Sequence, residues 1–84
     1  MNANQEYRVE YQTFGNPACS PDFPNPLTVP AGEFPAPHLE QAMRDRGYSE
    51  AIVTLHDASR GAYQIALEQS SQQVFEGMVH LIPL

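Results

Sequence analysis

The fold of this chain is first indicated by residues 6–13, which read EYRVEYQT. Tyr7, Val9 and Tyr11 alternate there with charged and polar residues. Successive side chains of a strand point to opposite faces, so these three share one face. A strand with one apolar and one polar face is typical of an antiparallel sheet whose second face meets solvent. The stretch therefore predicts a half-buried strand.

The next segment, residues 15–37, holds seven of the eight prolines of the chain. Each proline lacks a backbone N–H and pushes the preceding residue toward an extended conformation, so we expect no regular strand pairing there. Large apolar side chains lie in or beside the segment, which indicates a loop that wraps the core rather than a solvated linker. They are Phe14, Phe23, Leu27, Val29 and Phe34. The loop is either a binding element or a semi-rigid spacer.

Helical periodicity begins around Pro37, because Leu39 and Met43 are spaced to fall on one helix face. Proline is favoured at the first position of a helix, where the missing N–H has no partner to lose. Gly47 suits the left-handed residue that follows a helix end. We therefore predict a helix from Pro37 to just before Gly47, with Tyr48 packing on Met43.

Three further strands are predicted after the helix, at residues 51–56, 63–68 and 74–82. A polar turn at residues 57–61 joins the first two. Both faces of residues 51–56 are apolar, which predicts a strand in the interior of the sheet. Gly77 indicates a bulge or the close approach of another backbone.

These elements predict an α+β fold of two layers, with one helix packed on a four-stranded, mostly antiparallel sheet in the order β-loop-α-β-β-β. We expect residues 1–84 to form a single domain with a proline-rich wrapping loop at residues 15–37, because a chain of 84 residues can bury only one core. One helix covers one sheet face. The other face is therefore expected to meet solvent or a partner.

The composition of the chain indicates the cellular compartment in which the protein is expected. Cys19 is the only cysteine, which excludes an intrachain disulfide and a metal site built from several cysteines. No apolar stretch approaches the roughly 20 residues that a bilayer requires, and the first residues lack the character of a signal peptide. We expect a cytoplasmic protein that does not associate with membranes.

The net charge of the chain restricts the kinds of partner that the protein is expected to bind. Ten acidic residues stand against four arginines and no lysine, for a formal net charge of −6. Nucleic-acid binding requires clustered cations, so direct binding to nucleic acid is not expected. A basic protein surface is the natural complement, although an acidic excess also serves solubility.

The strand pattern predicts a polar sheet face that carries acidic and amide groups. We expect this face to bind a partner through Glu6, Arg8, Glu10, Gln64, Glu68 and Glu76. Tyr63 or Phe75 is expected to supply the buried aromatic anchor beside these polar groups. The alternative is an ordinary solvated face of an antiparallel sheet.

Catalytic and metal sites are not expected. His38, His56 and His80 are scattered along the chain, without the compact spacing of metal ligands. Cys19 lies between prolines and lacks the setting that activates a thiolate. The glycines stand apart and form no phosphate-binding loop. We therefore predict no catalytic residue, no metal and no cofactor.

The first functional hypothesis is a small, acidic, non-enzymatic protein-binding protein. In size, acidity and lack of catalytic signatures the chain resembles the small inhibitors that phages and mobile elements direct against host defence complexes, anti-CRISPR proteins among them. This resemblance is one of general character, and it implies a partner within a nucleic-acid-binding complex. Two alternatives stay open: a structural or accessory subunit that forms a homo-oligomer by pairing its last strand at a sheet edge, and a small metal-assisted enzyme that uses the histidines.

Overall fold

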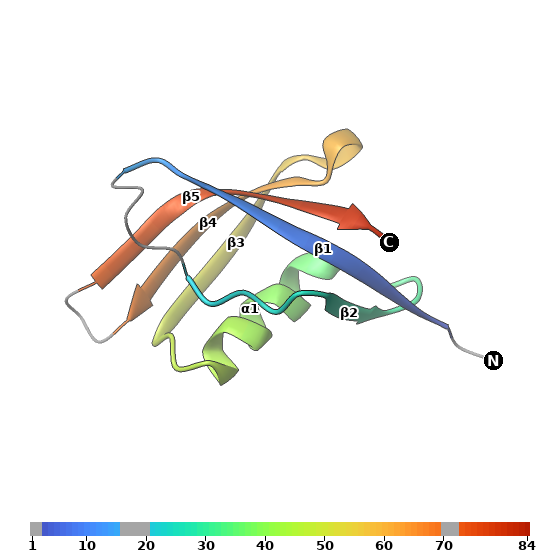
Figure 1. Ribbon diagram of the computed structural model, residues 1–84, viewed down its shortest axis with the longest axis horizontal. Helices are drawn as coiled ribbons and strands as arrows, with labels where there is room; N and C mark the ends of the chain where they lie inside the picture. The colour runs from blue at the N-terminus through green and yellow to red at the C-terminus, as the bar shows by residue number, and fades with distance from the viewer. Residues whose placement is uncertain (1–2, 16–20, 70–72) are drawn as a thin grey trace.

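The computed structural model describes residues 3–15, 21–69 and 73–84. In these ranges the chain forms five strands, one α-helix and one short 3-10 turn (Figure 1). The elements are β1 (Asn4–Thr13), β2 (Leu27–Pro30), α1 (Pro35–Asp45), β3 (Glu50–Asp57), η1 (Ala58–Arg60), β4 (Ala62–Gln69) and β5 (Gln73–Pro83).

The strands form one sheet in the order β2-β1-β5-β4-β3, and every neighbouring pair is antiparallel. The sheet curls around α1, which lies on its concave side (Figure 1). The predicted α+β class is confirmed. The predicted number of strands is wrong, because the sheet has five strands rather than four.

The additional strand is β2, which lies inside the segment where no strand pairing was expected. It pairs with β1 from Tyr7 opposite Leu27 to Asn4 opposite Pro30. Its burial alternates, with Leu27 and Val29 buried and the other two residues exposed. β2 is an edge strand, where a proline can face away from the ladder without breaking it. The prolines therefore shorten the strand and do not abolish it.

One strand holds a position opposite to that predicted. The strand that was expected in the interior, β3, lies at an edge of the sheet. The last strand, β5, which the homo-oligomer alternative placed at an edge, lies in the middle. β5 pairs with β1 on one side and with β4 on the other. An apolar strand gains the most shelter between two neighbours, which accounts for the long apolar run of β5.

The helix begins two residues earlier than predicted. Pro35 occupies the first helical position, and Pro37 also lies in the first turn, where proline is tolerated. Leu39 and Met43 have no exposed surface, and they fill the space between the helix and the sheet. Burial of side chains of this size stabilises a fold by about 1.5–3 kcal/mol each.

The helix ends as predicted. Gly47 adopts a φ of 100°, which a residue with a side chain rarely adopts. The Gly47 N–H donates to the Arg44 carbonyl at 3.0 Å, and the Tyr48 N–H donates to the Met43 carbonyl at 3.3 Å. These two bonds form a Schellman motif, in which Tyr48 and Met43 join the same apolar cluster.

Gly77 marks the close approach of another backbone, one of the two predicted possibilities. A Cβ atom at this position would collide with the Gln12 carbonyl oxygen, and it would lie 2.8 Å from the Tyr11 ring. The ladder between β5 and β1 continues without a shift at Gly77. Glycine therefore allows β1 and the Tyr11 ring to lie directly against β5.

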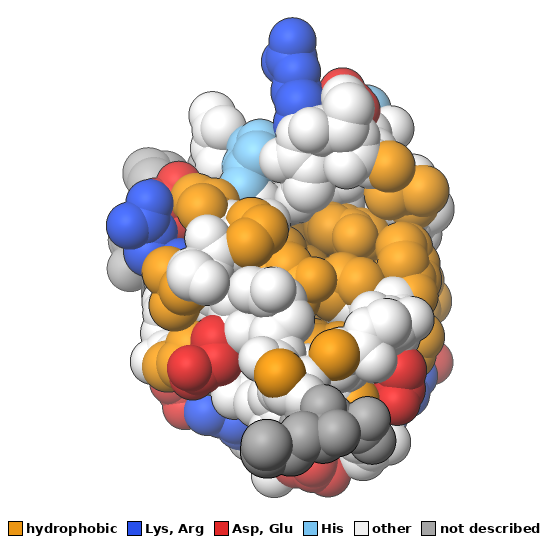
Figure 2. Space-filling model, turned by 90° about the vertical axis from the view of Figure 1, so that its right-hand side faces the viewer, with side chains coloured by type: hydrophobic (Ala, Val, Ile, Leu, Met, Phe, Trp, Pro, Cys, Tyr) orange, Lys and Arg blue, Asp and Glu red, His pale blue; other side chains and the backbone are white. Residues whose placement is uncertain are grey.

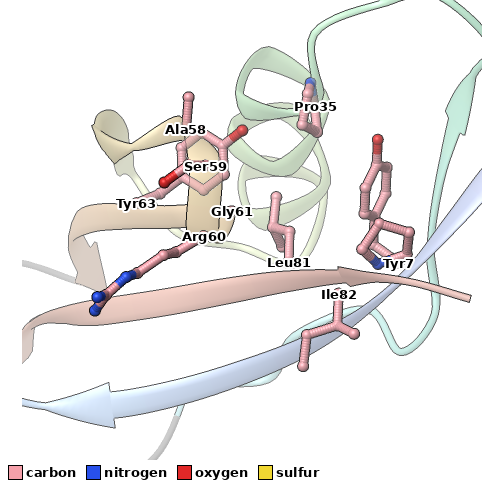
Figure 3. Close-up of a pocket in the computed structure, with 10 residues that line it drawn as sticks. Tyr7, Pro35, Ala58, Ser59, Arg60, Gly61, Tyr63, Leu81 and Ile82 are labelled. Carbon is pink, nitrogen blue, oxygen red and sulfur yellow. The ribbon is translucent and has the colours of Figure 1, made fainter.

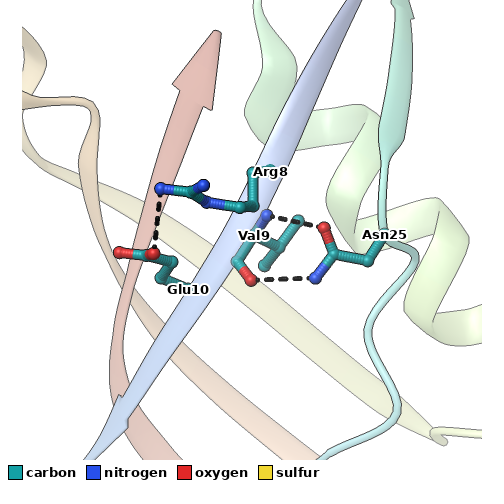
Figure 4. A network of polar contacts seen from close by, with 4 residues as sticks. All are labelled: Arg8, Val9, Glu10 and Asn25. Atoms are coloured by element: carbon teal, nitrogen blue, oxygen red, sulfur yellow. Dashed lines mark hydrogen bonds and ion pairs between the residues drawn. The ribbon is translucent and has the colours of Figure 1, made fainter. Parts of the chain in front are cut away.

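A side chain extends the pairing between β1 and β2. The Asn25 carboxamide accepts a hydrogen bond from the Val9 N–H at 3.2 Å and donates one to the Val9 carbonyl at 3.1 Å (Figure 4). It meets both backbone groups of one residue, as a neighbouring strand would. Asn25 thereby holds the segment before β2 against β1.

We expect Asn25→Ala to lower the free energy of unfolding by about 1–2 kcal/mol, because two backbone groups of β1 lose their partner. Urea denaturation followed by circular dichroism measures the change. Asn4→Ala is the matched control, since Asn4 lies exposed near the start of the same strand. Equal stability of the two variants would contradict the structural role of Asn25.

Candidate functional site: the outer sheet face

The convex side of the sheet, which we call the outer face, carries all six residues predicted to bind a partner. In β1 the side chains of Glu6, Arg8 and Glu10 alternate with core residues and are exposed. Gln64 and Glu68 of β4 and Glu76 of β5 alternate with core residues in the same way. The six side chains therefore lie on one side of the sheet.

These residues form two groups rather than one platform. One group lies on β1, and the other lies on β5 and β4, the two strands that follow β1 in the sheet. Between them, β5 presents Met78, His80 and Ile82, which lie opposite Gln12, Glu10 and Arg8 of β1. Neighbouring strands are about 4.8 Å apart, so two strand spacings separate β1 from β4.

The β1 group is partly neutralised within itself. The Arg8 Nη2 atom lies 3.2 Å from the Glu10 Oε2 atom, and both side chains are more than half exposed (Figure 4). An exposed ion pair of this kind contributes little to stability. Arg8, the only cation among the six predicted residues, is therefore paired with a carboxylate of the same group.

The prediction that Tyr63 or Phe75 supplies an aromatic anchor beside the polar groups is wrong. Tyr63 and Phe75 are buried in the core, on the opposite side of the sheet from Gln64 and Glu76. The outer face presents aliphatic side chains instead. Ile52 of β3 and Val74 of β5 are 52% and 60% exposed.

Two shallow hollows lie between these aliphatic side chains. One has a volume of about 170 Å³ and is lined by Ile52, Ala66 and Glu76 among others. The other has a volume of about 110 Å³, shares Ile52 and Ala66, and is also lined by Glu50, Glu68 and Val74. The small Ala66 side chain thus lines both hollows together with larger apolar side chains, and three carboxylates line one hollow or the other.

The outer face holds half of the acidic residues of the chain, five of ten. They are Glu6, Glu10, Glu50, Glu68 and Glu76. Glu50 of β3 and Glu68 of β4 are direct cross-strand partners. Like charges in that position destabilise a sheet, so this corner of the free protein carries an electrostatic cost that a bound cation would relieve.

Helix side chains cover part of the free edge of β3. The Val53 N–H donates to the Glu40 Oε2 atom at 2.8 Å, and the Arg44 Nη2 atom donates to the Ala51 carbonyl at 3.1 Å. These bonds satisfy backbone groups that a further strand would otherwise meet. Arg44 therefore has a structural role near the end of α1.

The histidines are not brought together. His38 Nε2 lies 2.8 Å from Glu33 Oε1, His56 is exposed on β3, and His80 lies opposite Glu10. Across residues 3–15, 21–69 and 73–84, no three His, Cys, Asp or Glu side chains are placed to hold a metal ion. Cys19 lies outside the described residues.

A comparison with known proteins finds no matching family, no matching curated protein and no matching solved structure. Within the described ranges, the helical structure lacks the length and apolar character needed to cross a bilayer.

We expect Glu50→Lys to raise the free energy of unfolding by about 0.5–1 kcal/mol, because it replaces a like-charge cross-strand pair with an opposite pair. Glu6→Lys is the control, since it makes the same change in net charge opposite the uncharged Thr28. Urea denaturation at low ionic strength compares the two variants. An equal effect of both substitutions would show that net charge, rather than the pairing with Glu68, sets the cost.

Proposed function

We propose that this chain is a non-enzymatic protein-binding protein whose outer sheet face docks onto a basic protein surface. The supporting observation is a sheet face that bears five carboxylates beside exposed aliphatic side chains. Ile52 and Val74 are more than half exposed there, although the strands that carry them are part of a well-packed sheet.

This arrangement has the two parts of a binding surface. Apolar groups that become buried on contact supply most of the affinity, and the charges around them exclude water and fix the orientation of the partner. Carboxylates also accelerate the encounter with a cationic surface. The outer face offers Ile52, Ala66 and Val74 for the first role, and Glu68 and Glu76 for the second.

A more specific form of the proposal is an inhibitor of the anti-CRISPR type, acting on a host defence complex that binds nucleic acid. Proteins that bind nucleic acid carry clustered lysine and arginine to neutralise phosphates. An acidic face that occupies such a cluster would compete with the nucleic acid. The support for this form is the charge of the outer face and of the whole chain, −6.

Self-association through the last strand, the alternative from the sequence, meets an obstacle in the topology. β5 is already paired on both sides, so among the strands of the described residues only β2 and β3 have a free edge. β2 is four residues long, and Glu40 and Arg44 cover part of β3. The docking proposal agrees better with these edges than edge pairing does.

The test compares two variants with equal net charge. The face variant carries Glu10→Gln, Glu68→Gln and Glu76→Gln. The control carries Asp22→Asn, Glu33→Gln and Asp45→Asn, three exposed acids away from the outer face. Affinity capture from cells that make the protein, at low ionic strength, first identifies a stoichiometric partner.

We expect the face variant to bind that partner at least about tenfold more weakly, which corresponds to about 1.4 kcal/mol. The control variant should bind the partner with the affinity of the natural chain. Binding of the natural chain should weaken as salt is raised, because exposed charges are screened. An equal loss in both variants, or an undiminished affinity of the face variant, would overturn the proposal.

A further inference from the structure

A cavity of about 380 Å³ opens at the end of the sheet where α1 begins. Its walls come from β1, the start of α1, the η1 turn with Gly61, β4 and the end of β5. Figure 3 shows the lining residues, among them Tyr7, Pro35, Tyr63 and Leu81. On the face shown in Figure 2, hydrophobic side chains gather around a hollow. The volume lies in the range of sites that bind small ligands or peptide side chains.

The charge of the lining differs from that of the rest of the molecule. None of the ten lining residues is acidic, in a chain with ten acids and four arginines. Arg60 is the charged residue among them, but its guanidinium points away from the two tyrosines (Figure 3) and its Nε lies 3.6 Å from Asp57 Oδ2. The cavity is therefore suited to a neutral ligand.

The Tyr63 side chain brings a hydroxyl to the cavity that has no hydrogen-bond partner among the described residues. Only 4% of the residue is exposed. Within the same residues, no side-chain oxygen or nitrogen is both fully enclosed and unpaired. The hydroxyl is therefore not fully enclosed, and a ligand in the cavity that Tyr63 lines would take the place of water as its partner.

The Tyr63 hydroxyl can donate a hydrogen bond to a ligand. Burial, with a contribution from Tyr7, raises the pKa of Tyr63, so the phenol stays protonated and can both donate and accept. Its ring is held against Phe34, with ring centroids 5.8 Å apart. The Tyr7 ring lies on the other side of Leu81 and Pro35, so two phenols flank the opening (Figure 3).

We propose that this cavity binds an extended, proline-containing peptide segment of a protein partner. Proline rings are apolar and fit between aromatic walls, while the carbonyls beside them accept hydrogen bonds from hydroxyl groups such as those of Tyr7 and Tyr63. Proline also lacks an N–H, so such a segment brings no backbone donor into a cavity whose lining holds no carboxylate to accept it. This site goes beyond the docking of the outer face and does not depend on it.

The test titrates the full chain with a blocked tetraproline peptide and follows the ring signals of Tyr7 and Tyr63 by NMR. A blocked tetraalanine peptide carries the same number of carbonyls without the rings, and benzamide represents a small neutral aromatic ligand. Tyr63→Phe removes only the hydroxyl. Tyr11→Phe is the matched control, because the Tyr11 hydroxyl donates to the Glu76 carbonyl and does not line the cavity.

We expect tetraproline to shift both ring signals in a saturable manner and to bind more tightly than tetraalanine. Tyr63→Phe should weaken binding by about threefold to tenfold, the effect of one neutral hydrogen bond, and Tyr11→Phe should leave it unchanged. Equal binding of tetraalanine, binding of benzamide alone, or no saturable shift at millimolar peptide would each overturn the proposal. The outer-face triple glutamine variant should bind tetraproline as the natural chain does, which separates this test from that of the proposed function.

Discussion

The insertion of α1 into the curl of the sheet is the constraint on which the rest of the structure depends. Leu39 and Met43 are fully enclosed between the helix and the strands, and truncation of such residues to alanine costs about 2–5 kcal/mol. The chain has one helix in its described part, and that helix lies on the concave side. Because the apolar sides of all five strands turn toward it, their alternate residues turn outward and make up the outer face.

The same helix explains why the outer face, rather than an edge, is the better candidate for binding. Glu40 and Arg44 lie one helical turn apart, and both reach backbone groups of β3. The helix thereby packs against the concave side of the sheet and also covers part of its edge. The convex face keeps exposed aliphatic groups and half of the acidic residues, in a protein of net charge −6.

The sequence predicted those parts of the fold that depend on local pattern. Alternation identified β1, and Gly47 identified the end of α1. β2 was missed because its pairing depends on which prolines face away from β1, and on the Asn25 side chain, which replaces a strand residue. Neither can be read from composition.

The candidate site was predicted in part for similar reasons. Alternation placed the acidic residues on one face, but it also separates Tyr63 from Gln64, so an aromatic anchor beside them was inconsistent with the period of a strand. The exposed Ile52 was overlooked because apolar residues on both faces indicated an interior strand. In the structure β3 is apolar toward α1 and exposed toward solvent, at an edge that the helix partly covers. Such long-range coverage depends on strand order, which the sequence does not reveal.

The outer face of the free protein is uncovered and presents aliphatic groups to solvent. Paramagnetic relaxation by a neutral, soluble gadolinium chelate measures this directly through the methyl signals. The account predicts strong relaxation of Ile52 and Val74 and very little of Leu39 and Val79, which are fully buried. If the Ile52 and Val74 methyls were as protected as those of Leu39, another part of the protein or a second copy would cover the face, and the account would be wrong.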